Sequence, residues 1–516
     1  MLETLVSVRM PSTRPVHGDA AAADSSEAQL DVLDTAEAGP SVIRGSLLRV
    51  GGNVLGTLVT VASSAVVIRH LGVIDTGRFL TVTALVTIVA GVSDLGLTAI
   101  AVREYSVKPR EDGRRFLRNL LGIRLMIVGT ALAGAIVFAA AVNYTSAMVL
   151  GTVIAGLGMV LFVVQDSLSI PLQVSLRLGW VAGLQLAIQV GVAVEAVLLA
   201  LAGAGLLPFF ALQLPVVLPV LVVTTVVGGR DARVLPAVDL PEWRRMLGRI
   251  VPFSVAVVLS ILYFRIAQIM VSLLSSPTQT GYFGVGFRVL DTVTTIPGLL
   301  AASALPVLAR SARDDAKRFA YVSRRLAESM MSGGFGLALA VFLGAGFAID
   351  VVAGPAFEPA VDVLRILSIA LLGTFVLSAR GYALLALDRL RAVLVCNALA
   401  FAVVVGAGVP LIHAMGARGA AIALVAAELT LAVGYEVALS ATRPEVRMPI
   451  GFVVRVVAAA LAASLLATVL SLPSIIAAIV GVAAYAAALL ALGVVPTELL
   501  EALRRRARPP ATGTGT

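Results

Sequence analysis

Long apolar runs separated by short polar connections dominate the chain from about residue 44 to residue 495. Each run has roughly the 20 residues that an α-helix needs to cross the ~30 Å hydrocarbon core of a bilayer. The pattern therefore predicts an all-α integral membrane protein with about 14 transmembrane helices. They lie near 47–68, 79–102, 118–141, 146–165, 178–203, 207–228, 250–274, 283–308, 332–351, 362–385, 391–412, 418–440, 450–471 and 474–495.

A short motif recurs at the same place in two halves of this pattern. Thr76-Gly77-Arg78-Phe79 follows the first predicted helix, and Thr280-Gly281-Tyr282-Phe283 follows the seventh. Six helices separate the two copies, so both halves start from the same side of the membrane. This placement predicts parallel repeats related by an axis along the membrane normal. We therefore expect two six-helix bundles around a central cavity, plus a C-terminal helix pair.

The predicted pattern divides the chain into six segments. One of them, the C-terminal pair of helices thirteen and fourteen, is expected to pack against lipid or, alternatively, to form a groove for a lipid tail. The segments are a disordered cytosolic tail (1–43), an N-terminal bundle (44–229), a cytosolic linker (230–249), a C-terminal bundle (250–441), helices thirteen and fourteen (450–495), and a cytosolic tail (496–516).

Composition supports the membrane interpretation, because 59% of the residues are hydrophobic and 13% are charged, whereas soluble domains carry about 25% charged residues. The net charge of +9 resides in short connections, a distribution that does not predict a nucleic-acid partner. Cys396 is the single cysteine, which excludes an intrachain disulfide and a cysteine-based metal cluster. The first 40 residues show no apolar signal segment, so the first transmembrane helix is expected to direct insertion.

Basic residues concentrate in the even-numbered connections. Five Arg or Lys residues fall between 103 and 115, and further groups fall in 230–249 and 310–325. The odd-numbered connections contrast with these, except for Arg69 and Arg78 in the first. Short cytosolic loops carry the excess of Arg and Lys. The even connections and both termini are therefore predicted to be cytosolic, in a multi-pass protein of the plasma (inner) membrane.

Several arginines fall inside or beside predicted spans, where a charge costs at least about 2.5–3.5 kcal/mol near the bilayer centre. The planar guanidinium binds phosphate oxygens bidentately, so Arg265 and Arg288 are predicted to bind an anionic head group in the cavity. Arg49 and Arg124 lie nearer the cytosolic edge, where they contact an entering head group or snorkel to the interface. The alternative for Arg265 is an internal ion pair, for instance with Glu195.

Acidic and amide side chains are the remaining polar candidates. Asp94, Glu195 and Glu428 are predicted either to couple transport to proton or sodium binding or to make structural helix–helix contacts. Gln268 follows Arg265 by about one turn, and Asp291 shares one face of its helix with Arg288. We expect both to be polar residues of the cavity. No catalytic residue, metal site or cofactor is predicted.

The order of short motifs resembles that of the polysaccharide flippases, the Wzx-like branch of the multidrug/oligosaccharidyl-lipid/polysaccharide exporter superfamily. The resemblance covers about residues 44–440. In the first half it rests on Ile68-Arg69-His70-Leu71-Gly72, Thr76-Gly77-Arg78-Phe79, Ser93-Asp94-Leu95-Gly96-Leu97 and Arg103. In the second half it rests on Tyr263-Phe264-Arg265-Ile266, Gly281-Tyr282-Phe283, Arg288, Pro297 and Ala304-Leu305-Pro306.

This resemblance implies a cavity that binds a polyprenyl-pyrophosphate-linked glycan and two bundles that rock to release it on the other side. The implied partners are the lipid-linked glycan, membrane lipids and proteins of cell-envelope glycan biosynthesis. One departure matters. Many relatives carry an acidic residue directly after the Arg-Ile of helix seven, where this chain has Ala267 followed by Gln268. Ion coupling would therefore act elsewhere, or not through that site.

Two other functions within the same superfamily stay open as alternatives. A lipid II flippase also takes a pyrophosphate-linked sugar. A drug/cation antiporter needs an acidic, aromatic cavity, whereas this chain is 5% aromatic and has arginines at membrane depth. A membrane enzyme would need carboxylates or histidines in a sizeable loop, and His70 and His413 are isolated. Translocation, without enzymatic activity, is the predicted function.

Overall fold

The computed structural model describes residues 38–494, except for the side chains of 38–50, 53, 54, 99, 110 and 249–253. Most of the predicted N-terminal tail (1–37) and the whole predicted C-terminal tail (496–516) lie outside the described residues. The first helix begins at Ala38, so residues 38–43 of the predicted tail are helical.

The described chain is built from α-helices and two short 3-10 turns, with no strand among the described residues. Within residues 38–494, thirteen helices are long and apolar enough to cross a membrane, and the first of these covers Leu55–Asp94. This segment of α1 (Ala38–Asp94) contains two spans, because Gly72 interrupts the helix with φ 70° and ψ −176°. Positive φ is accessible to glycine because it lacks a Cβ. The predicted all-α membrane fold is confirmed.

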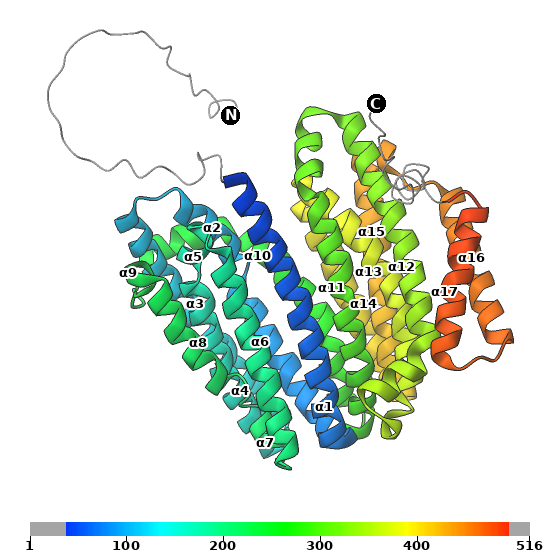
Figure 1. The fold of residues 1–516 in the computed structure, drawn as a ribbon, viewed down its shortest axis with the longest axis horizontal. Helices are drawn as coiled ribbons and strands as arrows, with labels where there is room; N and C mark the ends of the chain where they lie inside the picture. Colours follow the sequence, from blue (N-terminus) through cyan, green and yellow to red (C-terminus); the bar gives the residue numbers. More distant parts are fainter. Residues whose placement is uncertain (1–37, 495–516) are drawn as a thin grey trace, which may run out of the picture.

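The first half of the chain forms one group of helices, on the left of Figure 1. Its long helices are α1, α3 (Arg110–Ala141), α4 (Ser146–Leu168), α6 (Leu178–Leu201) and α8 (Leu214–Val227). Four short helices complete this half: α2 (Leu97–Ser106), α5 (Ile170–Val174), α7 (Leu206–Phe209) and α9 (Gly229–Ala232).

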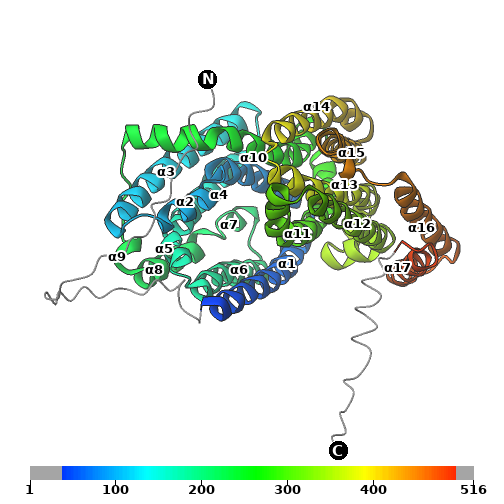
Figure 2. The ribbon, with the colours of Figure 1, turned by 90° about the horizontal axis from the view of Figure 1, so that it is seen from above.

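The second half forms the adjoining group, with α1 lying between it and α6 when the molecule is seen from above (Figure 2). Its helices are α10 (Leu240–Leu274), α11 (Pro277–Asp314), α12 (Ala316–Val352), α13 (Ala360–Ala386), α14 (Leu390–Met415) and α15 (Ala417–Thr442). The final pair, α16 (Ile450–Val469) and α17 (Ser474–Ala491), packs on α12. The Tyr485 hydroxyl donates to the Ser332 carbonyl oxygen at 2.9 Å and fixes this pair to the second half.

The predicted linker 230–249 is partly helical, because α10 already begins at Leu240. Asp239 caps this helix by accepting a hydrogen bond from the Glu242 amide at 3.3 Å, as N-cap carboxylates commonly do. Trp243 and Met246 then pack into the core of the first half, whereas the far end of α10 lies in the core of the second. One helix therefore connects both halves.

The predicted sixth helix, 207–228, is broken in two. α7 ends at Phe209, α8 begins at Leu214, and residues 210–213 form turns between them. Pro215 lies in the first turn of α8. Proline has no amide hydrogen and its ring clashes with the carbonyl four residues earlier, so a continuous helix through 211–215 is disfavoured. The break leaves irregular backbone inside the candidate span Leu206–Val227.

The two ends of the molecule differ in the contacts between the halves. We name as the basic end the one that carries the start of α1 and the Arg-rich connection between α11 and α12, at the top of Figure 1. The other end is named the opposite end, and the two halves touch there. At the opposite end Gly77 and Gly281, the glycines of the repeated motif, pack backbone to backbone. A Cβ on Gly77 would lie 2.8 Å from the Gly281 nitrogen, and one on Gly281 would lie 2.2 Å from the Val73 carbonyl oxygen.

Two polar contacts join the halves at the same end. Arg69 donates to the carbonyl oxygens of Asp350 and Val351 in the last turn of α12, at 2.7 and 2.8 Å. Hydroxyl groups of Tyr144 and Ser272 share a hydrogen bond of 2.6 Å. These contacts close the space between the halves at the opposite end.

Toward the basic end α1 and α11 carry exposed apolar side chains. Leu58 on α1 is 62% exposed and Leu300 on α11 is 50% exposed. Figure 1 shows the ribbons of these two helices diverging in that direction. Helices α1 and α11 therefore lie together at the opposite end and apart at the basic end, where α10 keeps the two halves connected.

Candidate functional site

Arg265 of α10 is held by an acidic residue of the next helix. Its guanidinium binds both carboxylate oxygens of Asp291, at 3.0 and 3.1 Å. The same group lies over the rings of Phe264 and Phe287, 5.7 and 5.4 Å from their centroids, which adds cation–π attraction. The suggested ion pair with Glu195 is wrong, because Asp291 takes that place. Each of the paired side chains is 21% exposed.

Arg288 lies three residues before Asp291, on the same face of α11. Its guanidinium crosses to α1 and donates to the Ser64 hydroxyl at 3.0 Å. We name Arg265, Arg288 and Asp291 the cation cluster. The cluster holds two positive charges and one negative charge at the contact between the two halves.

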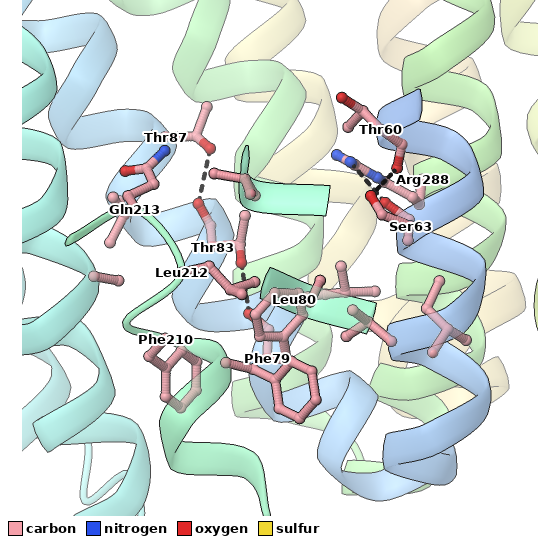
Figure 3. A pocket seen from close by; sticks show the side chains of 18 of the residues that line it. Thr60, Ser63, Phe79, Leu80, Thr83, Thr87, Phe210, Leu212, Gln213 and Arg288 are labelled. Carbon is pink, nitrogen blue, oxygen red and sulfur yellow. Dashed lines mark hydrogen bonds between the residues drawn. The ribbon is translucent and has the colours of Figure 1, made fainter. Parts of the chain in front are cut away.

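A cavity of about 250 Å³ adjoins Arg288 and extends into the first half of the molecule. Both spans of α1, together with α4 and α6, form its walls, and the break between α7 and α8 closes one side (Figure 3). We name it the hydroxyl pocket. Its polar lining consists of Thr60, Ser63, Ser64, Thr83, Thr87, Gln213 and Arg288, and its aromatic lining of Phe79, Phe209 and Phe210.

Four of the five hydroxyl groups of this pocket donate to the backbone of their own helix, and the fifth, that of Ser64, accepts from Arg288. Thr83 donates to the Phe79 carbonyl and Thr87 to the Thr83 carbonyl, each at 2.8 Å (Figure 3). Their oxygens keep free lone pairs, because a hydroxyl has one donor and two acceptor sites. The side-chain amide of Gln213 makes no hydrogen bond within the part of the chain that the structure describes. The pocket thus offers hydroxyl acceptors together with an unused amide.

Arg124 lies in a separate cluster inside the first half. It is 3% exposed and donates to Asp94 at 3.2 Å, Asp166 at 3.0 Å and the Ser167 hydroxyl at 2.9 Å. Arg124 therefore does not snorkel to the interface. It is also absent from the lining of the hydroxyl pocket, so a contact with an entering head group stays a prediction. Sequence reasoning missed Asp166, which directly follows the predicted end of helix four.

Asp94 stands at a helix break formed by the Ser93–Leu97 motif. Leu95 and Gly96 have φ angles of 47° and 75°, which separate α1 from α2. The Asp94 carboxylate accepts a hydrogen bond of 2.6 Å from the Thr98 hydroxyl and a longer one of 3.4 Å from the Thr98 amide. The observed contacts of Asp94 are structural, and its predicted role in ion coupling stays a prediction.

Glu428 is buried between three helices of the second half, with 1% of its side chain exposed. It accepts hydrogen bonds from the hydroxyls of Tyr263 on α10 and Thr374 on α13, both at 3.1 Å. In the described part of the chain no cationic side chain forms an ion pair with it. A carboxyl group in such surroundings is suited either to hold a proton or to join the helices.

Gln268 and Glu195 are the other polar candidates. Gln268 is buried, and its amide donates to the Thr81 hydroxyl at 3.4 Å across the contact between halves. One carboxyl oxygen of Glu195 is buried without a hydrogen-bond partner. The side chain of Arg49 lies outside the described residues. The structure therefore brings Arg265, Arg288 and Asp291 together and leaves the other candidates apart from them.

Arg380 was missed in the sequence, although it lies inside the predicted span 362–385. It is fully buried and pairs with Glu436 of α15 at 2.5 Å. It also donates to the Val446 carbonyl oxygen at 3.2 Å, in the connection that leads to α16. An arginine within an apolar run was the available signal. Its contacts tie α13 to α15 and to the final helix pair.

Comparison with known proteins identifies a family match and several similar folds. Residues 57–362, more than half of the chain, match the sequence profile of a family described as polysaccharide biosynthesis protein. No curated protein matches the sequence. The lipid II flippase MurJ, in an inward closed conformation, has a similar structure, with a TM-score of 0.69, 11% identity, and coverage of 86% of this chain and 98% of that chain.

Two further structures of the MOP superfamily are similar. An inward-facing multidrug resistance transporter of the MATE family gives a TM-score of 0.59 at 14% identity, covering 75% of this chain and 96% of that chain. A transporter from Pyrococcus furiosus, described by the reverse polarity of its binding pocket, gives 0.53 at 15% identity, covering 78% and 96%. At these identities the likeness is one of fold.

Proposed function

This chain belongs to the family of polysaccharide biosynthesis proteins, as its motifs predicted, and from this premise we propose that it translocates a polyprenyl-pyrophosphate-linked glycan across the plasma membrane by alternating access. The cation cluster is the observation that carries the proposal. It places two arginines, with one carboxylate, at the contact between two helix bundles of a membrane protein. A pyrophosphate is the part of such a cargo that needs fixed cations inside the membrane.

The cluster is prepared for an anion by the way its members are held. Asp291 binds one edge of the Arg265 guanidinium, and two aromatic rings limit its movement. Arg288 is fixed through one bond to Ser64 and keeps its other donors for a ligand. Guanidinium groups suit phosphate because their donors match two oxygens at once.

The contacts between the halves support the alternating-access part of the proposal. The opposite end is closed by Gly77 and Gly281 and by the bonds of Arg69, whereas the ribbons of α1 and α11 diverge toward the basic end (Figure 1). With the basic end in the cytosol, cargo reaches the cluster from the side on which it is synthesised. Separation of the halves at the opposite end then releases it outside.

A head-group transfer assay in proteoliposomes tests this function. A fluorescent polyprenyl-pyrophosphate oligosaccharide is placed in one leaflet, and its appearance in the other is followed for wild type, Arg265→Ala and Arg288→Ala. Loss of a cavity cation is expected to slow transfer at least ten-fold. Arg118→Ala, an exposed arginine of α3, is the matched control and should transfer normally.

The other outcomes separate the alternatives. Transfer that both cavity variants retain keeps the flippase function and removes the cation cluster from its mechanism. Faster transfer of lipid II than of other glycans identifies a lipid II flippase, the function of the structurally similar MurJ. Dye export that depends on a cation gradient, with no glycan transfer, identifies an antiporter and overturns the proposal.

We further propose that Glu428 couples transfer to a proton or sodium gradient, since this buried carboxyl contacts hydroxyl groups rather than a cation. Glu428→Gln keeps the shape of the side chain but cannot exchange a proton. Transfer by this variant is expected to lose its response to an imposed gradient, with each ion tested in turn. A gradient response equal to that of wild type excludes Glu428 from coupling.

A further inference from the structure

The hydroxyl pocket lies directly beside the cation cluster but has a different chemistry. Arg288 belongs to both, so a group bound at Arg288 has the pocket as its immediate neighbour. The pocket is also formed where α7 and α8 are interrupted. Irregular backbone at membrane depth is tolerated where it lines a cavity, and interrupted helices form substrate sites in transporters. This position favours a ligand-binding role over a packing defect.

The polar groups of the pocket match a polyhydroxylated ligand. Thr60, Ser63, Thr83 and Thr87 donate to backbone carbonyls of their own helix, so their oxygens accept hydrogen bonds from ligand hydroxyls. The free amide of Gln213 supplies both donor and acceptor at the opposite wall (Figure 3). Three phenylalanine rings form an apolar floor, which suits the C–H face of a sugar ring.

The charge of the lining restricts the ligand further. Arg288 is the single charged residue that lines the pocket. With Arg288 bound to a phosphate, a sugar carboxylate placed here would be buried without a cation. An unpaired buried charge costs far more than a buried hydroxyl that finds hydrogen-bond partners. The lining therefore favours an uncharged sugar.

The volume limits how much of the glycan fits. Pockets that hold drug-sized molecules measure about 300–1,000 Å³, and this one measures about 250 Å³. A single hexose-sized residue suits this space, whereas an oligosaccharide does not. The rest of a longer glycan would lie between the halves, toward the basic end.

We propose that the hydroxyl pocket binds the sugar that is bonded to the pyrophosphate, as one uncharged hexose-sized residue, while Arg288 holds the adjacent phosphate. This inference rests on the proposed function and adds to it a specificity for the first sugar. Gln213 and Thr87 are its recognition residues. They contact the sugar and not the phosphate.

Binding of three short-chain analogues to the full-length protein in nanodiscs tests the proposal. The probes are farnesyl diphosphate alone, its glucosyl derivative and its glucuronosyl derivative, and the readout is the dissociation constant by calorimetry. Wild type should bind the glucosyl probe at least ten-fold more tightly than either of the others. Gln213→Leu and Thr87→Val should each reduce this preference to within about three-fold, with unchanged affinity for farnesyl diphosphate.

Two matched substitutions outside the pocket serve as controls. Gln185→Leu removes an exposed amide from α6, and Thr130→Val removes an exposed hydroxyl from α3. Both should keep the wild-type preference. Gln213→Lys adds a cation to the pocket and should invert the order, so that the glucuronosyl probe binds more tightly than the glucosyl probe.

The results separate the sugar site from the underlying function. The sugar site is overturned by a wild type that binds all three probes equally. It is also overturned by pocket variants that keep the preference, or by a Gln213→Lys variant that still rejects the glucuronosyl probe. Failure of the proposed function looks different, since farnesyl diphosphate itself would then not bind to wild type, or Arg288→Ala would not weaken its binding.

Discussion

Arg265 and Arg124 are both interior arginines paired with carboxylates, but their surroundings give them different roles. Arg265 has one carboxylate partner, Asp291, which shares a helix face with Arg288, the residue that bonds to the first half. Arg124 has two and lies within one half, where the cluster carries a net negative charge. A cation surrounded by excess acid is poorly suited to bind a phosphate. The surroundings thus favour a substrate role for Arg265 and a structural role for Arg124.

Replacing Arg124 tests this structural role. Arg124→Ala leaves Asp94 and Asp166 close together without a cation, and loss of one partner of a buried pair destabilises by about 3–5 kcal/mol. The carboxylates are 45% and 30% exposed, so solvent screening should reduce the loss to about 2 kcal/mol. The thermal unfolding midpoint in detergent measures it. Adding Asp166→Asn should restore part of the loss, and the exposed-site variant Arg118→Ala should unfold like wild type.

Asp239 gives a pH-dependent contact outside the membrane. The hydrogen bond from Arg115, aided by the Glu242 amide, lowers the pKa of Asp239 below its ordinary value. The stability that Asp239 adds to the start of α10 is therefore fully present above the ordinary pKa of about 3.9. It is lost as the pH falls through the lowered value. Asp239→Asn should remove this transition.

Trp243 is the probe for the Asp239 contact, because it is buried in the same turn region of α10. In a Trp180→Phe background its fluorescence should shift to longer wavelength on acidification of the wild-type sequence. The shift should be missing when Asp239 is Asn. An equal acid transition in both proteins would show that other groups control this region.

At the residue scale the sequence predicted Arg265, Arg288 and Asp291 as neighbours of a cavity, but not their pairing. A fixed arginine at membrane depth needs a partner; Glu195 was the partner suggested from the sequence, whereas the structure has Asp291 in that place. The choice depends on how α10 rotates toward α11, which no short-range pattern records. Gln213 was missed for a related reason, because it becomes part of a pocket only where the predicted helix 207–228 breaks.

At the scale of elements, helix existence was predictable and helix continuity was not. Apolar runs located the spans, since each needs its own stretch of lipid-soluble residues. The breaks at Leu95-Gly96 and at 210–213 depend on single backbone positions. The segment 230–249 was predicted only as a cytosolic linker, and α10 begins inside it with a capped first turn. Polar helices at a membrane surface give no apolar run to detect.

The crossing of Gly77 and Gly281 yields a prediction at this scale. Gly281→Ala places a methyl group 2.2 Å from the Val73 carbonyl oxygen, a backbone atom that a side-chain rotation cannot move. The helices should separate at the opposite end. Gly298→Ala, on the same helix, is the control because a Cβ at Gly298 would have no neighbouring atom within 4 Å.

Thiol labelling measures this separation. In a Cys396→Ser background, Leu80→Cys places a cysteine in the hydroxyl pocket, and an impermeant maleimide is added from the side of the opposite end. Labelling should be roughly ten-fold faster with Gly281→Ala than with Gly298→Ala, since a penalty of about 1.4 kcal/mol changes an equilibrium ten-fold. Equal rates would mean that the glycine contact does not control access.

At the scale of the whole molecule, the repeat predicted two halves, and the structure brings the repeated glycines into contact with each other. The sequence did not indicate which end is closed, because the same apolar spans are compatible with contact between the halves at either end. Arg69 was an exception to the predicted charge distribution. The structure accounts for it, since Arg69 joins the first half to the last turn of α12, where the helix dipole attracts a cation.

Arg69→Gln should shift the molecule toward the state that is open at the opposite end. Two charge-assisted hydrogen bonds are lost, and a shift of about 2 kcal/mol corresponds to roughly thirty-fold in the equilibrium. Spin labels at Ser146 and Glu358, both exposed, report the separation by pulsed electron resonance. Arg78→Gln is the control because Arg78 pairs with Asp75 of its own half. An unchanged distance distribution for Arg69→Gln would contradict the prediction.

The hydrogen bond between Arg288 and Ser64 has a consequence for the release of a bound molecule. Arg288 belongs to the second half, whereas the pocket walls belong to the first. A cargo bound as proposed thus contacts two sites, Arg288 and the pocket, and its overall affinity exceeds that of either site alone. When the halves separate, a cargo bound to one site is no longer held near the other, so the effective concentration that favours the second contact falls. The movement that exposes the cargo to the far side therefore also lowers the affinity of the protein for the cargo, without any change in Arg288 or in the pocket residues.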